Sequence, residues 1–169
     1  MDIIVKDTNI IIDLINIGLE GFCRLLEVEF HTTLHVIREI KEPSQRQKLT
    51  SMVLEGKLIV DEFTPIEYER LLDMLGTYSE VNNLSDADWS VIILAERYKC
   101  RLLTSDRRLK RQAESYGLKV NGLLWIVDAL VEKGIIKGQD MIPYLERYRD
   151  TNERAPQNEI KRLMEKYKE

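Results

Sequence analysis

The chain contains few of the residues on which many common active sites depend. Its 169 residues include two cysteines and two histidines. Cys23 and Cys100 lie far apart, with no C-x-x-C spacing and no histidine pair beside them, which argues against a zinc site. We expect both to be reduced and to pack as small apolar side chains. No Ser–His–Asp or Cys–His arrangement indicates a side-chain nucleophile either.

Long apolar runs and targeting features are also missing. No run approaches the roughly 20 apolar residues that a transmembrane helix needs. The N-terminal stretch MDIIVKDTN does not begin with a basic segment followed by a long apolar one. We therefore expect a cytoplasmic protein with no membrane segment. Hydrophobic residues at 44% and charged residues at 32% indicate a soluble globular chain, with the length of one ordinary domain.

A histidine metal site also receives little support. His31 and His35 are four residues apart, a spacing that would put them on one face of a helix. However, Phe30, Thr32 and Thr33 indicate the end of a strand, so the two histidines are not expected to lie on one helix face.

A formal net charge of −4 argues mildly against a nucleic-acid partner, although the average hides two basic clusters. The first surrounds Asp106 and the second lies towards the C-terminus. The first cluster consists of Lys99, Arg101, Arg107, Arg108, Lys110 and Arg111. The second consists of Arg147, Arg149, Arg154, Lys161 and Arg162. The first cluster is either an RNA-facing surface beside a site or a solvated helix face.

Strands and helices are expected to alternate along the chain. Short β-branched and apolar runs predict strands at residues 3–5, 28–32, 57–60, 100–103 and 118–120. Between and after the strands we expect helices. The first runs from Asp7 or Thr8 to Gly18, and the next three cover residues 22–26, 34–40 and 44–54. A further helix runs from residue 64 or 65 to Gly76, another begins at Ser85, and the last two cover residues 106–116 and 122–133. This alternation predicts an α/β sandwich with a mainly parallel sheet, spanning residues 1–133. Residues 134–169 form a charged extension with two expected helices, 139–149 and 156–168.

Four acids fall near the ends of these expected elements. Asp7 follows the first strand and Asp106 the fourth, at the sheet edge where α/β proteins bind ligands. Glu39 lies towards the end of a helical segment, and Asp88 occupies the capping-box position behind Ser85. Each acid alone is explained by helix capping or by solvent. Together they predict a site for a hard divalent cation, Mg²⁺ or Mn²⁺, which would relieve their repulsion and activate water for cleavage of a nucleic acid.

The order and surroundings of these acids resemble the PIN-domain family. The matching pieces are IIVKDTNIIIDL, HVIREI and LSDADWSVIILAERYKCRLLTSDRRLKRQAESYGLKV, which follow the family's order across residues 2–130. The resemblance is to the small prokaryotic members that include toxin ribonucleases of toxin–antitoxin pairs. The C-terminal part is similar to a subgroup of PIN-like proteins with a longer helical extension.

The resemblance implies a fold, an activity and a set of roles. The fold is a three-layer α/β/α sandwich with a five-stranded parallel sheet, and the activity is that of a Mg²⁺- or Mn²⁺-dependent ribonuclease. Asp7, Glu39, Asp88 and Asp106 would bind the metal. Asn9 and Thr104 would orient these acids. Asp86 is the alternative to Asp88 as a metal ligand. Residues two positions apart on a helix lie on different faces, so these two side chains should not both point inward.

The partners that the resemblance implies are RNA, in single-stranded form for many such nucleases, an antitoxin protein and a second copy of the chain. Other functions remain open. An aspartyl phosphatase would carry an acid where this chain has Asn9, and a Toprim-type nuclease would leave Asp7 and Asp106 without roles. The strongest alternative is a PIN fold that binds RNA or a protein without cutting.

Overall fold

The protein is built around a five-stranded sheet. The computed structural model describes residues 2–169, without the side chains of residues 78–82. The strands are β1 (Asp2–Lys6), β2 (Val28–Thr33), β3 (Ile59–Asp61), β4 (Arg101–Leu103) and β5 (Val120–Asn121). They lie in the order β3-β2-β1-β4-β5, and each neighbouring pair is parallel. The predicted parallel α/β sheet is confirmed.

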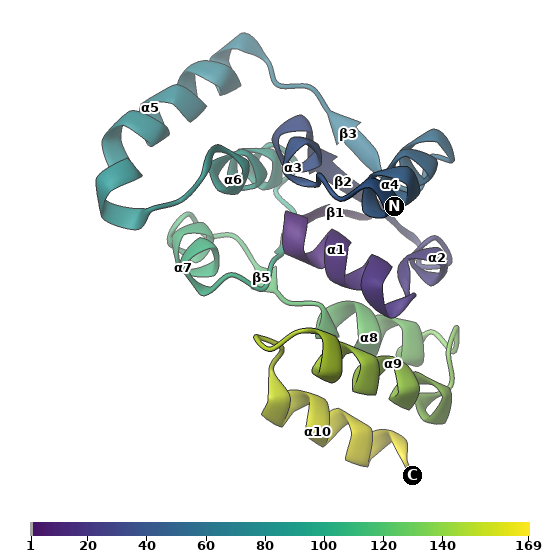
Figure 1. The fold of residues 1–169 in the computed structure, drawn as a ribbon. Coiled ribbons are helices and arrows are strands. Elements are labelled where there is room, and N and C mark those ends of the chain that lie inside the picture. The colour runs from purple at the N-terminus through teal and green to yellow at the C-terminus, as the bar shows by residue number, and fades with distance from the viewer. Residues whose placement is uncertain (1) are drawn as a thin grey trace.

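Ten helices surround this sheet in the described part of the chain: α1 (Thr8–Ile17), α2 (Glu20–Cys23), α3 (Leu34–Glu39), α4 (Pro43–Leu54), α5 (Pro65–Asn82), α6 (Asp86–Tyr98), α7 (Arg107–Ser115), α8 (Leu124–Glu132), α9 (Gly138–Thr151) and α10 (Gln157–Tyr167). In Figure 1, α6 lies on one side of the sheet with α5 beside it, and α1 lies on the other side. Helices α8 and α9 lie beyond α1. The molecule is therefore the three-layer α/β/α sandwich that the resemblance implied.

The central strands and α6 form the apolar interior. Val5 of β1 and Leu102 of β4 are fully buried, as expected for strands covered on both faces. The residues of α6 from Trp89 to Ala95 are buried where this helix contacts β1 and β2. Ser85 caps α6 and forms the predicted capping box with Asp88, so the start of this helix was correctly predicted.

Several expected boundaries were wrong, among them the start of β3, which lies at Ile59 instead of residue 57. Gly76 does not end α5, which continues to Asn82. A glycine inside a helix costs only about 1 kcal/mol, and the burial of Leu71 and Met74 where α5 packs on α6 offsets that cost. The short second helix covers residues 20–23 instead of 22–26, and the last strand begins at Val120 instead of residue 118.

The C-terminal extension packs firmly on the rest of the chain. Helix α9 contacts α1 and α8, and α10 packs on α9. Tyr148 of α9 is buried, and Asn152 donates a hydrogen bond from Nδ2 to Oδ2 of Asp13 at 3.0 Å. The division of the chain into a domain of residues 1–133 and an extension of residues 134–169 stays a prediction. Across residues 2–169, no helix is both long and apolar enough to cross a membrane.

Candidate functional site

Asp7 and Asp106 lie at the carboxyl edge of the sheet, where the strand order turns back between β1 and β4. Asp7 directly follows β1 and is only 3% exposed. Thr104 follows β4, and its hydroxyl donates to Oδ2 of Asp7 at 2.7 Å and accepts from the backbone N–H of Asp106 at 3.1 Å. One threonine therefore connects the two acids at the place where parallel α/β sheets bind ligands.

The loop that carries Asp106 is held on both sides. The side-chain oxygen of Asn9 accepts from the backbone N–H of Ser105 at 3.1 Å. Asp106 itself is the N-cap of α7, because its carboxylate accepts from the N–H groups of Arg108 at 2.8 Å and Leu109 at 3.3 Å. Asn9 and Thr104, which the resemblance named as orienting residues, thus both contact this loop.

Glu39 lies between the N-terminal ends of α1 and α6. It is the last residue of α3, and its Oε2 accepts from the hydroxyl of Thr8 at 2.7 Å. Its Oε1 accepts from the hydroxyl of Ser85 at 3.5 Å. Asp88 is bound to the same serine, because its Oδ2 accepts from the Ser85 N–H at 2.9 Å. These hydroxyls bring Glu39 to the other acids although it is far from them in sequence.

The four carboxylates lie within one another's electric field. Burial raises the pKa of Asp7 to about 7, the hydrogen bond from Thr104 opposes this rise, and the charges of Asp88 and Glu39 add to it. Burial also raises the pKa of Asp88, and Asp106 and Glu39 raise it further. The structure therefore brings together the four acids that the sequence singled out.

The four acids fit a hard divalent cation in their chemistry, but they are not already arranged around one. Carboxylate oxygens are the donors that Mg²⁺ and Mn²⁺ prefer, and the mutual repulsion at this edge is what a cation relieves. Within the described residues, no three His, Cys, Asp or Glu side chains form a group that could hold a metal ion as it stands. Asp88 and Asp106 each accept backbone N–H groups through one carboxylate oxygen, so the other oxygen of each is the one that could bind a metal.

Asp86 and Asp88 point in different directions, as their spacing in α6 requires. Asp86 is exposed and lines a groove of about 430 Å³ together with Thr8, His35, Arg38, Glu39 and Lys41. Asp88 is half-buried and interacts with the other acids. The choice of Asp88 as the metal ligand stays a prediction, supported by this proximity.

Several residues at the site were missed by sequence reasoning. Thr8 and Ser85 hold Glu39, and Arg38 and Lys41 add positive charge to the groove. The available signals were weak: Thr8 and Ser85 were noted only as helix caps, while Arg38 and Lys41 flank Glu39 in the sequence.

The basic cluster expected around Asp106 is split by the fold, so that expectation was wrong in part. Arg107, Arg108, Lys110 and Arg111 are exposed on α7, which Asp106 begins. Arg101 begins β4, and together with Lys99 it lines a cavity at the opposite, amino edge of the sheet. A strand separates these residues from Asp106 because neighbours in sequence move apart along an extended chain.

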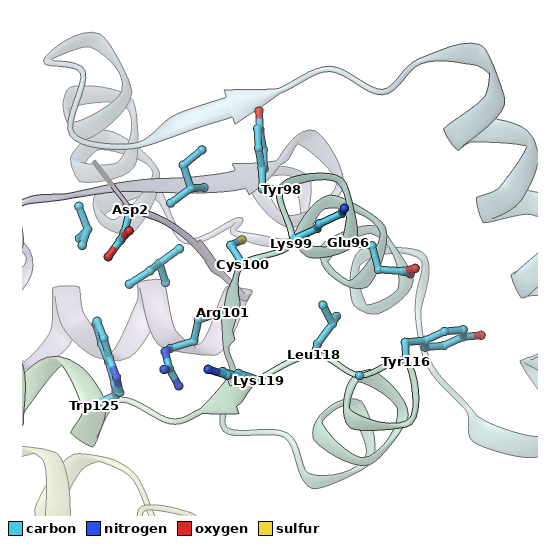
Figure 2. A pocket seen from close by; sticks show the side chains of 14 residues that line it. Asp2, Glu96, Tyr98, Lys99, Cys100, Arg101, Tyr116, Leu118, Lys119 and Trp125 are labelled. Atoms are coloured by element: carbon cyan, nitrogen blue, oxygen red, sulfur yellow. The ribbon is translucent and has the colours of Figure 1, made fainter.

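That cavity at the amino edge has a volume of about 790 Å³ and is larger than the groove beside Glu39. Figure 2 shows Trp125, Arg101 and Lys119 on one side of it and Tyr116 and Glu96 on the other. The guanidinium of Arg101 lies 5.4 Å from the ring centre of Trp125. Size alone does not make this cavity the functional site, because the four interacting carboxylates all lie at the carboxyl edge.

Comparison with known proteins gives a family and a small set of relatives. A family model described as a PIN domain matches residues 3–169. The endoribonuclease Nob1 of Pyrococcus abyssi is 29% identical over 102 residues, which cover 60% of this chain and 63% of that protein. The chain thus spans less than two thirds of the length of this relative.

Two solved structures share the general outline of the fold. The first is VapBC2 from Rickettsia felis bound to a promoter DNA fragment, with a TM-score of 0.49, 19% identity and coverage of 71% of this chain and 98% of that one. The second is FitAcB from Neisseria gonorrhoeae, with a TM-score of 0.41, 16% identity and coverage of 69% and 95%. Likeness at this level does not indicate function.

Proposed function

This chain belongs to the PIN-domain family, and on that premise we propose that it is a divalent-metal-dependent ribonuclease, an endonuclease that hydrolyses phosphodiester bonds. The observation that carries the proposal is the convergence of four carboxylates at the carboxyl edge of the sheet, with the pKa of the buried Asp7 raised by burial and by its acidic neighbours. The similarity of 102 residues to an endoribonuclease supports RNA as the substrate.

In this proposal Asp7, Glu39, Asp88 and Asp106 hold Mg²⁺ or Mn²⁺, and the bound ion supplies an activated water and stabilises charge on the phosphate. The rest of the chain keeps these acids in place. Thr104 connects Asp7 to the Asp106 loop, and the hydroxyl of Thr8 fixes Glu39 beside them. The exposed cations Arg38 and Lys41 border the groove, where they can pair with phosphates on either side of the cleaved bond.

The biological setting is part of the same proposal. The likeness of the quoted motifs to small toxin nucleases supports a role as the toxin of a toxin–antitoxin pair in the cytoplasm. The partners would be single-stranded RNA, an antitoxin protein and a second copy of the chain, whose acidic groove would join the first.

Metal binding is tested by thermal unfolding. We expect Mn²⁺ to raise the Tm of the wild-type protein, because a ligand that binds only the folded state stabilises it. The double variant Asp7→Asn with Asp106→Asn should lose this rise. An unchanged Mn²⁺ shift in the double variant would contradict the metal site.

Catalysis is tested with a mixed pool of single-stranded RNA. We expect cleavage that depends on Mg²⁺ or Mn²⁺, stops in EDTA and is lost in Asp88→Asn. Asp86→Asn is the matched control, because it removes the same charge two residues away on a different face of α6, and it should keep most of the activity. Cleavage that persists in EDTA would contradict the mechanism.

One observation favours a second function, that of a PIN-fold module that binds RNA or a protein without cutting. Asp88 and Asp106 are engaged as helix caps, and the acids are not preassembled around a metal. A protein that binds RNA with equal affinity in EDTA and in Mn²⁺, and cleaves it in neither, would have this function.

A further inference from the structure

Three aromatic rings cluster beside the carboxylate groove. His35 comes from α3, Phe63 from the loop after β3, and Tyr68 from the first turns of α5. The ring centres of His35 and Phe63 are 5.7 Å apart, those of Phe63 and Tyr68 are 5.6 Å apart, and those of His35 and Tyr68 are 6.3 Å apart. Residues 35, 63 and 68 are called the aromatic cluster below.

The aromatic cluster is continuous with the groove. His35 lines the groove together with Glu39 and Asp86, and it also lines a smaller cavity of about 160 Å³ together with Phe63 and Tyr68. Tyr68 is 45% exposed, so its ring is accessible to a ligand that extends out of the groove. A nucleic-acid strand that runs along this groove past Glu39 would meet these rings next.

We propose that the aromatic cluster is a base-stacking site that binds the single-stranded RNA flanking the cleaved bond. This inference rests on the proposed ribonuclease function. Every base presents a π-face, so exposed rings bind single strands with little regard to sequence. Bases of single strands are free to stack in this way, whereas those of a duplex are already stacked on one another.

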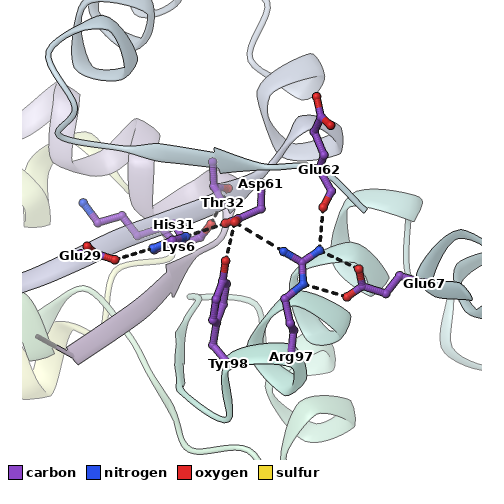
Figure 3. A network of polar contacts seen from close by, with 9 residues as sticks. All are labelled: Lys6, Glu29, His31, Thr32, Asp61, Glu62, Glu67, Arg97 and Tyr98. Atoms are coloured by element: carbon purple, nitrogen blue, oxygen red, sulfur yellow. Dashed lines mark hydrogen bonds and ion pairs between the residues drawn. The ribbon is translucent and has the colours of Figure 1, made fainter. Parts of the chain in front are cut away.

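A polar network, drawn in Figure 3, connects the segments that carry Phe63 and Tyr68. The guanidinium of Arg97 donates to the backbone carbonyl of Glu62 at 2.7 Å and pairs with Glu67 at 2.6 Å. It also lies 6.0 Å from the ring centre of Phe63. Arg97 therefore ties the loop that carries Phe63 to α5, and a site fixed before binding costs less conformational entropy when it binds.

The same network reduces negative charge beside the cluster. Asp61 accepts a hydrogen bond from the hydroxyl of Tyr98 at 2.5 Å, lies 2.5 Å from Nδ1 of His31 and is 3.5 Å from Arg97. Glu67 is paired with Arg97 as described above. Two carboxylates that would repel a phosphate backbone thus have polar or cationic partners, as Figure 3 shows.

Charge and position favour RNA over a protein as the occupant. Arg38 and Lys41 are exposed in the groove that His35 shares with the cluster, so cations for phosphates and rings for bases lie along one path. A docked protein partner or a second copy would use the exposed apolar side chains nearby, such as Leu34 and Ile66, without needing those cations.

The experiment uses single-stranded oligouridine of about eight nucleotides, in EDTA to prevent cleavage, with the fluorescent base 2-aminopurine at one position at a time. Stacking on a protein ring quenches this fluorescence. We expect quenching at one or two neighbouring positions with the wild-type protein. Tyr68→Ala should remove it and raise Kd about 5- to 100-fold, the range for loss of one stacked base.

Two further variants serve as controls and a third as a second test. Tyr68→Phe keeps the ring and should keep Kd within about 2-fold. Leu54→Ala truncates a side chain that is 82% exposed on α4, outside the cluster, and should bind like the wild type. Phe63→Leu should resemble Tyr68→Ala, with its Tm measured to confirm folding. Because Tyr68 is half-exposed, Tyr68→Ala should fold normally and decides the test if Phe63→Leu does not fold.

Cleavage separates failure of this inference from failure of the proposed function. In Mn²⁺ we expect Tyr68→Ala to raise KM with little change in kcat, because stacking binds substrate and transition state alike. RNA cleavage with no effect of Tyr68→Ala on Kd or KM would overturn the stacking site alone. A changed molecular mass in Tyr68→Ala with unchanged RNA affinity would overturn it in favour of a protein interface. No RNA binding or cleavage by the wild type would overturn both proposals.

Discussion

Asp7 is the most strongly perturbed acid of the candidate site. It is nearly inaccessible to solvent, which disfavours its charged form, while the Thr104 hydroxyl and the Thr8 N–H favour that form. The balance raises its pKa from 3.8 to about 7. A buried carboxyl group with such a pKa reduces the stability of the metal-free protein, and this has a measurable pH dependence.

The direction of this pH dependence follows from the number of protons that the folded and unfolded states bind. Between about pH 4 and 7 the unfolded chain has released the Asp7 proton and the folded chain has kept it, so rising pH favours unfolding. The loss of stability is absent below pH 4 and complete above pH 7, and reaches about 4 kcal/mol, because each unit of pKa shift corresponds to about 1.4 kcal/mol. In EDTA, Asp7→Asn should therefore be more stable than the wild type at pH 8, and the two should converge at pH 4. Urea unfolding at a series of pH values measures this difference.

Asp13 supplies the control for this measurement. Burial raises its pKa to about 6, so the stability gained by Asp13→Asn should stop growing near pH 6, whereas that of Asp7→Asn should grow up to pH 7. Identical pH profiles of the two variants, or an Asp7→Asn protein less stable than the wild type at pH 8, would contradict the pKa assigned to Asp7.

The sequence placed some site residues better than others, for a physical reason. Asp7 and Asp106 were placed correctly because both follow apolar strands, and parallel strands end at one edge. Glu39 could not be placed in the same way. Its contacts with Thr8 and Ser85 join residues 31 and 46 positions apart, and local patterns carry no information about such distant pairs.

At the scale of elements, local signals predicted helix starts better than ends. Ser85 and Asp106 cap α6 and α7 as expected, because a capping side chain binds the backbone N–H groups next to it. The end of α5 depends instead on its packing against α6, which Gly76 does not reveal. Strand β5 has two residues, too few for a period-two pattern to fix its start.

The C-terminal extension contributes a contact that its charged sequence did not suggest. Tyr148 of α9 is buried, and its side chain interacts with that of Ser105, the residue before Asp106, which opposes the rise in the Tyr148 pKa caused by burial. Ser105 is held from the other side by Asn9. The extension therefore supports the loop that carries one of the four acids.

We expect Tyr148→Phe to loosen this loop. Loss of the polar interaction with Ser105 should lower the free energy of unfolding by at most about 1 kcal/mol, and RNA cleavage should slow because Asp106 is held less firmly. The control is Tyr144→Phe on the same helix, whose ring packs edge-on against Phe22. That variant should keep both stability and activity. Equal cleavage by the two variants would show that α9 does not position Asp106.

At the scale of the whole molecule, the net charge of −4 predicts poor nucleic-acid binding, whereas the fold separates charge into distinct surfaces. Acids gather at the carboxyl edge, and exposed arginines follow directly on α7. The second basic set includes Lys161 and Arg162 on α10, which Figure 1 places beyond α9, on the side of that helix away from the sheet. The sequence lists both sets but does not say which one faces the acids, since that depends on how the layers pack.

These two surfaces can be compared directly. Arg107→Glu with Arg108→Glu should weaken the binding of single-stranded RNA, because both side chains are exposed beside Asp106. Each lost phosphate contact should reduce the slope of log K against log salt by about 0.7. Lys161→Glu with Arg162→Glu changes the net charge equally but lies on α10, and should leave that slope unchanged. Fluorescence anisotropy across a salt series measures both. Equal weakening by the two pairs would mean that overall charge, and not the surface at the carboxyl edge, governs RNA binding.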